Sequence, residues 1–246
     1  MDLSIVIPAY NEAAKIRSDI KAAAAFLKKH QISGEIIIVD DGSTDGTAKT
    51  AKNTTVLPGV KLLVLQLKNH TGKGNAIRSG IQASSGNLVM FADSGLCVPY
   101  SEALKGISLI RNSECDIAHG SRKLPESDIV LPQPWHRRFF STLFRLLLIA
   151  FMKIPVRFSD TQCGFKIYDG EVGRSLYGDS FTNGFMLDVE IILRVLNSGY
   201  RIEEFPIQWR CDRDSRLSVT RSPWRIFAEL REIKKKVSRI NQVLQR

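Results

Sequence analysis

The sequence predicts an α/β fold in which helices flank a mainly parallel central sheet. Strand-like and helix-like segments alternate four times over the first 93 residues, and such alternation is typical of strand–helix–strand units. The expected strand at residues 35–39 is a nearly continuous apolar run, as parallel strands are when both of their faces are buried. In a sheet of this kind, ligands bind beyond the carboxyl ends of the strands.

The first half of the chain supplies the regular part of this pattern. Short apolar or β-branched runs that end at polar residues or proline predict four strands, over residues 3–7, 35–39, 60–67 and 87–92. Helices are expected between them, over residues 13–29, from Thr44 or Asp45 onward, and from about residue 75. A polar loop follows each strand, so the four loops should lie at the same edge of the sheet.

The second half of the chain is less regular. We expect two strands and two helices there, the strands over residues 116–119 and 201–209 and the helices over residues 137–154 and 186–197. Prolines at positions 125, 132 and 134 predict a mobile loop. A basic amphipathic helix is predicted over residues 223–244. We therefore expect one main domain, residues 1–222, followed by a helical appendage, residues 223–246.

Composition and charge limit the number of domains and the kinds of partner that this chain is expected to have. The 246 residues suit one large domain or two small ones. A formal net charge of +10 suits nucleic acid, an anionic membrane or a phosphate-bearing substrate. The four cysteines are far apart and form no CxxC pair, which argues against a zinc site or a disulfide framework and favours a reducing compartment. No apolar run reaches the roughly 18–20 residues that span a bilayer, and we expect no signal peptide.

Two adjacent carboxylates follow the second expected strand, in the run Asp40-Asp41-Gly42-Ser43. At a strand end, such a carboxylate can accept hydrogen bonds from a nucleotide base or a ribose. The same four residues would also form an Asx turn followed by a helix cap. The local pattern supports both interpretations equally.

Two further loops carry residues that suit an anion or a cation. Lys73 and Gly74 resemble part of a phosphate-binding loop but lack the GxxxxGK[ST] spacing. Backbone amides at the start of the following helix would attract an anion, although a glycine turn explains these residues as well. Asp93 ends an apolar strand, where a carboxylate packs poorly. It would suit Mg²⁺ held by one or two carboxylates and a diphosphate, or it would cap a helix.

The stretch richest in hydrogen-bonding groups is DTQCGFK at residues 160–166. So many polar groups beside a glycine and an aromatic ring fit a buried core poorly, and they indicate a loop that shapes a site. The helix expected after it carries Asp188 and Glu190. We therefore interpret the whole region as one wall of a binding cleft.

Taken together, four motifs resemble the family 2 glycosyltransferases of GT-A fold. They are PAYNE at residues 8–12, VDDGS at 39–43, GKGNAIR at 72–78 and DTQCGFK at 160–166. The resemblance runs from about residue 3 to residue 217 and favours the polyprenyl-phosphate branch, especially the dolichyl-phosphate β-glucosyltransferases. DTQCGFK is a specific match, as are MLDVE at residues 186–190 and Trp209 followed by SRL at residues 215–217.

The resemblance implies a role for each matching residue. The nucleotide would be surrounded by Pro8, Tyr10, Asn11, Glu12, Asp40 and Asp41, with the nucleotide-sugar beside Lys73 and Arg78. Asp93 would face the diphosphate and hold Mg²⁺ or Mn²⁺. The acceptor phosphate would be bound by Arg122, Arg138, Ser215 and Arg216. The catalytic residues would be Asp93, Asp160, Gln162 and Asp188.

The sequence departs from the family pattern at the end of the fourth strand. The family usually has Asp-x-Asp there, whereas this chain has Asp93-Ser94-Gly95. In the alignment that preserves the strand, Asp93 matches the first aspartate and Gly95 replaces the second. In the alternative alignment, Asp93 matches the second and Phe91 replaces the first. One carboxylate of the usual pair is missing in either case.

The implied function is an inverting transfer of a hexose, with glucose from UDP-glucose as the expected donor, to a polyprenyl or dolichyl phosphate. A phosphate acceptor needs little deprotonation near pH 7 because its second pKa is about 6. Two alternatives remain: a family 2 enzyme that acts on a sugar hydroxyl, and a nucleotide-sugar-binding module that has lost catalysis. A nucleic-acid partner is not expected, because the cations are not interleaved with stacking aromatic residues.

Two helices suit a membrane surface. The apolar helix at residues 139–154 would either dock at the interface or belong to the core. The basic helix at residues 223–244 would bind an anionic leaflet, pack on the domain or pair with a second subunit. We expect a protein that is peripheral at the cytoplasmic face of a membrane, with a homo-oligomer or a membrane partner protein as a further expectation.

Overall fold

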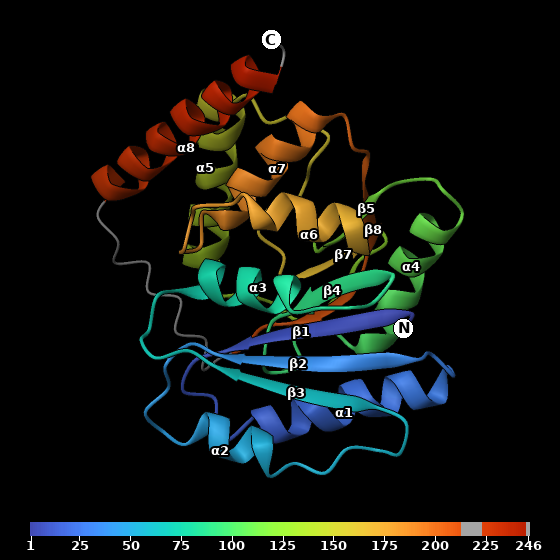
Figure 1. The fold of residues 1–246 in the computed structure, drawn as a ribbon. Coiled ribbons are helices and arrows are strands. Elements are labelled where there is room, and N and C mark those ends of the chain that lie inside the picture. Colours follow the sequence, from blue (N-terminus) through green and yellow to red (C-terminus); the bar gives the residue numbers. More distant parts are fainter. Residues whose placement is uncertain (213–222, 245–246) are drawn as a thin grey trace.

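Seven strands form the central sheet of the computed structural model, which describes residues 1–212 and 223–244 (Figure 1). Their order across the sheet is β3-β2-β1-β4-β7-β5-β8. In chain order they are β1 (Leu3–Ala9), β2 (Gly34–Asp40), β3 (Lys61–Gln66), β4 (Leu88–Ala92), β5 (Ile117–Ser121), β7 (Phe165–Asp169) and β8 (Ile202–Pro206). A second, two-stranded sheet pairs β6 (Asp128–Leu131) with β9 (Gln208–Arg210).

The pairing confirms the predicted mainly parallel sheet. Strands β1 to β4 pair in parallel, as do β5 and β8. Only β7 runs antiparallel to its neighbours, β4 and β5. Because of this reversal, Phe165 at the start of β7 pairs with Ala92 at the end of β4. The segment that leads into β7 therefore lies at the edge where the parallel strands end.

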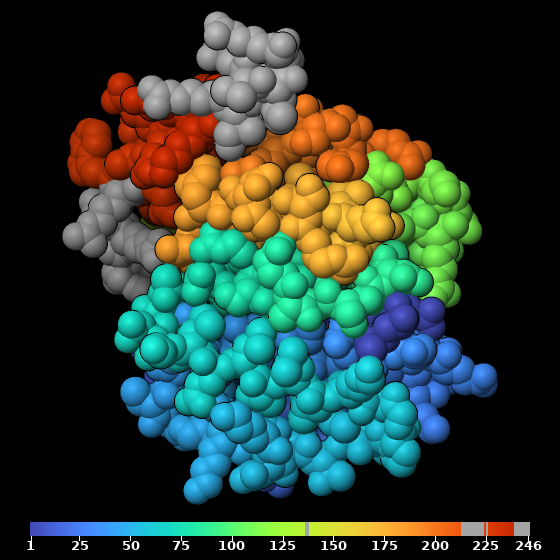
Figure 2. Space-filling model, viewed as in Figure 1, coloured from blue at the N-terminus to red at the C-terminus, as the bar shows by residue number. Residues whose placement is uncertain are grey.

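Helices cover both faces of the sheet (Figure 1). One face packs against α1 (Ile16–Lys29), α2 (Thr47–Lys52) and α4 (Ala103–Arg111), which follows the short 3₁₀ helix η1 (Tyr100–Glu102). The other face packs against α3 (Lys73–Gln82), α5 (Trp135–Met152), α6 (Gly170–Gly178), α7 (Leu187–Ser198) and α8 (Pro223–Leu244). Figure 2 shows the surface of this second layer, where the gold residues of α6 lie directly against the blue-green residues of α3.

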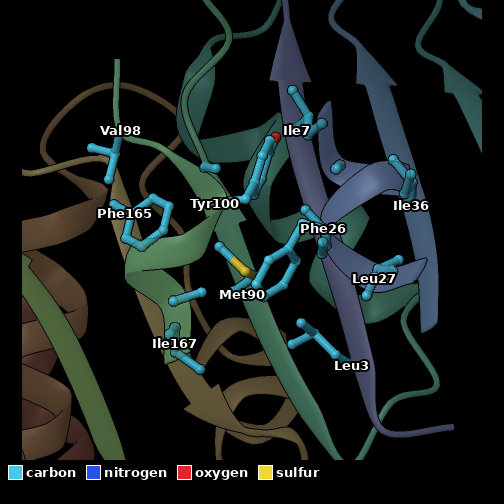
Figure 3. Packing of buried hydrophobic residues seen from close by; sticks show 14 of the residues in the cluster. Leu3, Ile7, Phe26, Leu27, Ile36, Met90, Val98, Tyr100, Phe165 and Ile167 are labelled. Carbon is cyan, nitrogen blue, oxygen red and sulfur yellow. The ribbon is translucent and has the colours of Figure 1, made fainter. Parts of the chain in front are cut away.

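Alternation along the strands divides the core between the two layers. Leu3, Ile5 and Ile7 of β1 face α1, whereas Val6 faces α3. Figure 3 shows the first of these clusters, in which Phe26 and Leu27 of α1 lie beside residues from four strands. Each such aliphatic or aromatic side chain contributes about 1.5–3 kcal/mol when it is removed from water. Burial on both faces is the reason why these strands read as continuous apolar runs.

Several elements of the second half differ from the predictions. Residues 165 and 166 were expected in a loop, but they begin β7, a short strand with both faces buried. The single strand expected over residues 201–209 is split, because Pro206 ends β8 and the following residues pair with β6 in the second sheet. Helices α4 and α6 were not predicted. The mobility expected of the proline-containing loop stays a prediction.

The C-terminal helix α8 packs on the rest of the chain. Its side chains Leu230, Ile233 and Val237 are buried in the same cluster as residues of α7. The ring of Phe227 lies 4.7 Å from that of Phe151 in α5. Packing on the domain, one of the alternatives for this helix, is therefore observed, and the division into two domains stays a prediction. Among the residues that the structure describes, none of the helices has the length and hydrophobicity of a membrane span.

Candidate active site

Hydrogen bonds are the main contacts between the loops that follow β1, β2 and β3. The buried carboxylate of Asp41 accepts hydrogen bonds from the backbone N–H groups of Thr71 (3.0 Å) and Gly72 (2.8 Å). It also lies 2.7 Å from Nδ1 of His70. Gly42 has a φ of +73°, and a Cβ atom there would lie 2.6 Å from the backbone nitrogen of His70. Asp41 therefore shapes the loop that leads into α3, and only glycine fits beside it.

Asp40 offers an acceptor that the protein itself does not use. Its side chain is fully buried, and Oδ1 accepts a hydrogen bond from the backbone of Ser43 at 3.2 Å. Within the described part of the chain, Oδ2 has no hydrogen-bond partner. A cavity of about 320 Å³ borders this residue and is also lined by Lys49, Lys52 and Gln66. A buried acceptor without a partner costs about 1–3 kcal/mol, so this oxygen is suited to a donor from a ligand.

The residues predicted to surround the nucleotide lie beside these loops. Tyr10 stacks on His70, with ring centroids 3.8 Å apart. The backbone of Asn11 donates to Ser43, and that of Glu12 donates to Thr47 at 2.8 Å. Pro8 lies within β1, in register with Val39. The expected nucleotide residues thus lie in strand ends and loops that contact one another, with Pro8, Asp40 and Asp41 buried. Their contacts with a nucleotide stay predictions.

Lys73 and Asp93 form an ion pair in the middle of the edge. Nζ of Lys73 lies 2.6 Å from Oδ1 of Asp93. Burial would lower the pKa of Lys73, but the charges of Asp93 and Asp188 outweigh it and raise that pKa above its usual value. The backbone N–H of Asp93 donates to the carbonyl of Gly164 at 2.9 Å. A Cβ atom on Gly164 would lie 2.0 Å from Oδ2 of Asp93, so a larger residue there would displace this carboxylate from its place against the loop.

Arg122 and Asp160 form a second ion pair next to this loop. Nε and Nη2 of Arg122 donate to the two oxygens of Asp160 at 2.6 and 2.7 Å, and the backbone N–H of Arg122 donates at 3.0 Å. Burial would raise the pKa of Asp160, but the charge and hydrogen bonds of Arg122 hold that pKa below its usual range. Glu204 accepts hydrogen bonds from the backbone of Ser159 and Asp160. The guanidinium also lies 5.3 Å from the ring centre of Trp209.

Lys166 and Asp188 form a third pair, which is buried. Nζ of Lys166 donates to Asp188 and to the carbonyl of Thr161, the latter at 3.0 Å. His119 is next to Lys166 in the sheet register, and burial together with the lysine charge holds its pKa well below the usual value. Lys166, His119 and Glu204 were not among the predicted site residues. For Lys166 a signal was present in the sequence, because this lysine is part of the polar motif DTQCGFK. The structure adds that its side chain is buried in β7.

Other predicted residues are placed less centrally. Arg78 donates to the carbonyl of Ser180 at 2.7 Å and to the side chains of Asn75 and Asn183, so it holds α3 against the loop before α7. Nε2 of Gln162 lacks a hydrogen-bond partner among the described residues. Arg138 lies on the exposed surface of α5. Two further predicted phosphate-binding residues, Ser215 and Arg216, lie outside the described residues.

A continuous line of contacts thus connects the predicted loops. It runs from Asp41 through Gly72 and Lys73 to Asp93, and from Asp93 to Gly164 in the loop that carries Asp160. The expectation that these distant carboxylates share one edge of the sheet is confirmed. The roles that were predicted for the individual side chains stay predictions.

Comparison with known proteins agrees with this arrangement. The family model described as glycosyl transferase family 2 matches residues 4–168. The chain belongs to this family. A dolichyl-phosphate beta-glucosyltransferase of Saccharomyces cerevisiae is 33% identical over 223 residues, which cover 84% of this chain and 66% of the yeast protein. One from Trichomonas vaginalis is 30% identical over 228 residues, which cover 89% of this chain and 68% of the relative. The chain spans about two thirds of the length of these relatives.

Solved structures extend the likeness of this family 2 chain to its fold. The glucosyl-3-phosphoglycerate synthase of Mycobacterium tuberculosis, crystallised with Mn²⁺, UDP-glucose and phosphoglyceric acid, matches with a TM-score of 0.66 at 20% identity over 94% of this chain and 76% of that chain. The mannosyl-3-phosphoglycerate synthase of Rubrobacter xylanophilus matches with a TM-score of 0.66 at 18% identity over 100% of this chain and 76% of that chain. The expected GT-A fold is confirmed.

The carboxylates of this family 2 chain provide few donors for a divalent cation. The described residues contain no group of three or more acidic, histidine or cysteine side chains that would hold a metal ion. Asp93 is the predicted ligand, and Lys73 already engages its Oδ1. The side chains present therefore do not fit a cation held by the protein alone, since Mg²⁺ and Mn²⁺ are bound by oxygen ligands that carry net negative charge.

Proposed function

We propose that this chain transfers a hexose from a nucleoside diphosphate sugar to a polyprenyl or dolichyl phosphate, with inversion at the anomeric carbon. UDP-glucose is the proposed donor. Two findings support the proposal: the relatives named dolichyl-phosphate beta-glucosyltransferase align with most of the chain, and a protein of the same fold was crystallised with UDP-glucose. The observation that carries it is the continuous line of contacts from Asp41 to the loop of Asp160 at one edge of the sheet.

The state of the carboxylates favours a phosphate acceptor over a sugar hydroxyl. A hydroxyl acceptor requires a general base, and Asp160 and Asp188 are the candidates. Both are buried and each is paired with a cation, which engages both oxygens of Asp160 and Oδ1 of Asp188. A phosphate monoester is already largely dianionic near pH 7 and needs no such base. The ion pairs are therefore compatible with an acceptor that brings its own nucleophilic oxygen.

Positioning and charge stabilisation are the main contributions of the protein to this reaction. A phosphate oxygen of the acceptor forms the new bond to the anomeric carbon while the bond from that carbon to the nucleoside diphosphate breaks. Developing positive charge at the sugar resembles an oxocarbenium ion, and the departing diphosphate gains negative charge. In this proposal Lys73 faces the diphosphate and Arg122 binds the acceptor phosphate, so each cation acts where charge develops or must be held. Their ion pairs with Asp93 and Asp160 at the same edge of the sheet support these roles.

The exposed face of α5 supports an acceptor that resides in a membrane. Four large apolar side chains recur there at spacings of three or four residues and remain 79%, 61%, 54% and 56% exposed: Trp135, Phe139, Leu143 and Leu146. The opposite side of the helix is buried through Leu148 and Met152. Arg138, Lys153 and Arg157 lie exposed near this face. An apolar row flanked by cations suits the surface of an anionic bilayer, so we propose peripheral binding at the cytoplasmic face.

Some expected partners of this reaction stay predictions. Mg²⁺ or Mn²⁺ at the diphosphate stays a prediction. The side chains present do not fit a cation held by the protein alone, and we derive no step through it. A homo-oligomer or a membrane partner protein also stays a prediction.

A transfer assay tests the proposal. The purified chain is incubated with labelled UDP-glucose, or with other labelled nucleotide-sugars, and with vesicles that contain polyprenyl phosphate. Label that moves into the organic phase only when polyprenyl phosphate is present supports the proposal. A matched reaction with Arg122→Gln should lose transfer while it still binds UDP. Transfer to a soluble sugar instead of the lipid would favour the hydroxyl-acceptor alternative, and UDP-glucose binding without any transfer would favour the binding module.

A further inference from the structure

We infer that Lys73, and not a divalent cation, supplies the positive charge that the leaving diphosphate requires. The inference rests on the proposed function and deepens it, because it concerns how the same site handles the diphosphate.

The first argument is the charge balance of the carboxylates around the diphosphate position. Four of them each have a cationic partner: Asp93 with Lys73, Asp160 with Arg122, Asp188 with Lys166 and Asp212 with Lys15. Each of these four carboxylates is therefore matched by one cation, and Lys15 also lies 3.9 Å from Glu12. A divalent cation is held by carboxylates whose charge is available to it. A diphosphate that binds beside these ion pairs instead meets lysine and arginine side chains, which can release a carboxylate and bind a phosphate oxygen in its place.

The second argument is the state of the position where the second aspartate of the family motif would stand. In the alignment that preserves the strand, Gly95 occupies it, with a φ of +92°, and its backbone N–H donates to the buried carboxylate of Asp19. A Cβ atom on Gly95 would lie 3.0 Å from Oδ2 of Asp212. The two oxygens of Asp212 accept hydrogen bonds from Nζ of Lys15 at 2.9 and 2.8 Å. Of the two carboxylates beside Gly95, Asp19 is therefore engaged by backbone N–H groups and Asp212 is paired with Lys15.

The third argument is the geometry of Lys73 itself. Its ammonium group is held by Asp93 at 2.6 Å and lies 6.0 Å from the ring centre of Phe91, and the side chain is only 20% exposed. A cation held in place before the substrate arrives loses little entropy when it binds a phosphate oxygen. Once Nζ donates to the diphosphate, a carboxylate oxygen of Asp93 becomes available to accept a hydroxyl of the sugar or the ribose. One ion pair can therefore provide both a donor and an acceptor.

The experiment measures transfer and nucleotide binding with and without metal. The chain is stripped with a chelator, and UDP affinity is measured by calorimetry alongside the transfer rate, in the presence and absence of Mg²⁺ or Mn²⁺. We expect both quantities to change by no more than about twofold on chelation. Lys73→Gln should lower the transfer rate by about 100-fold, as expected when one charge-stabilising donor is removed. Lys68→Gln, a change of an exposed lysine in the preceding loop, is the matched control.

The outcomes separate this inference from the proposed function. Transfer that survives chelation and falls in Lys73→Gln but not in Lys68→Gln supports the inference. Transfer that disappears on chelation and returns with Mg²⁺ or Mn²⁺ overturns it and leaves the proposed function intact. If no transfer is seen under any condition, the proposed function fails, and the UDP-binding data alone decide whether Lys73 has the inferred role. UDP affinity that is independent of metal but lost in Lys73→Gln then supports the role of Lys73, and affinity that rises more than about tenfold with metal overturns it.

Discussion

Two parts of the candidate site hold their carboxylates in different ways. In the part proposed to bind the nucleotide, here called the nucleotide side, Asp41 and Asp19 are held mainly by backbone N–H groups of neighbouring loops. In the part proposed to bind the acceptor, here called the acceptor side, Asp160 and Asp188 are paired with the side chains of Arg122 and Lys166. Backbone donors persist whatever the side chains are, whereas a side-chain cation can be lost in one substitution. The acceptor side should therefore be the more sensitive to mutation and the nucleotide side the more tolerant.

The largest effect is expected at the buried Lys166–Asp188 pair. Lys166→Met leaves the carboxylate of Asp188 buried without its cation, which should lower the free energy of unfolding by about 3–5 kcal/mol. Urea unfolding followed by tryptophan fluorescence measures this loss. His70→Gln on the nucleotide side is the comparison, with an expected loss of about 1 kcal/mol because Asp41 keeps its backbone donors.

A double variant sharpens the interpretation. Lys166→Met combined with Asp188→Leu removes both buried charges, so most of the lost stability should return. Equal losses of unfolding free energy in Lys166→Met and His70→Gln would show that the acceptor side is no more sensitive to mutation than the nucleotide side.

The pH dependence should also distinguish the two modes of holding a carboxylate. Burial raises the pKa of Asp19 from 3.8 to about 6, although the backbone groups of Gly95 and Leu96 oppose this. Between these values the folded chain retains a proton that the unfolded chain has lost. Stability from this group is therefore present below about pH 4 and is lost as the pH rises through about 6, by about 3 kcal/mol. Asp160, whose pKa is held low by Arg122, contributes in the opposite direction, since its stabilisation is lost on acidification.

Asp19→Asn tests this prediction. The variant cannot titrate at position 19, so its free energy of unfolding relative to the unmodified chain should rise as the pH increases from about 4 to 7. The measurement is urea unfolding of both proteins across that range. A difference that stays constant with pH would contradict the assigned pKa.

The first four strands could be predicted from the sequence because their signal is local. Each is an apolar or β-branched run that ends at a polar loop, and the strands β1 to β4 follow the expected ranges to within about two residues. β7 was missed because a five-residue strand that contains a buried lysine has neither the length nor the composition of a typical strand. Its antiparallel pairing also depends on contacts between segments that are far apart in the chain.

The site could be predicted only in part for a related reason. The convergence of Asp41 and Asp93 follows from the rule that loops gather where parallel strands end, whereas Asp160 reaches the same edge only because β7 runs antiparallel to its neighbours. The partners of those carboxylates do not follow from any such rule. Arg122 and Asp160 are 38 residues apart in the chain, and Glu204, which holds the backbone of Asp160, is 44 residues beyond it. Such pairings are decided by tertiary packing, which a single sequence does not display.

A substitution at Gly164 tests how closely the two sides are joined. Gly164→Ala would place a methyl group on the carboxylate of Asp93, which must then move away from the loop and so change its position relative to Lys73. Transfer from UDP-glucose to polyprenyl phosphate should fall by about 100-fold, because a displacement of about 1 Å in a catalytic group has effects of this size. Gly178→Ala at the end of α6 is the control, since a Cβ atom there would lie 3.4 Å from its nearest neighbour. Unchanged transfer in Gly164→Ala would show that the position of Asp93 is not critical.

The smallest effect is expected at the exposed apolar row of α5, which we propose to meet the membrane. Phe139→Ser and Leu143→Ser should leave the fold unchanged because both side chains are exposed. Each should reduce binding to vesicles of an anionic lipid by about tenfold, the equivalent of about 1.4 kcal/mol of apolar burial at the interface. Sedimentation with vesicles measures the bound fraction. Leu57→Ser, a change of an exposed leucine in the connection between α2 and β3, should have no effect. Equal losses of vesicle binding for Leu57→Ser and Phe139→Ser would mean that α5 is not the surface that meets the membrane. A lipid acceptor would then have to reach the candidate site from another surface of the protein.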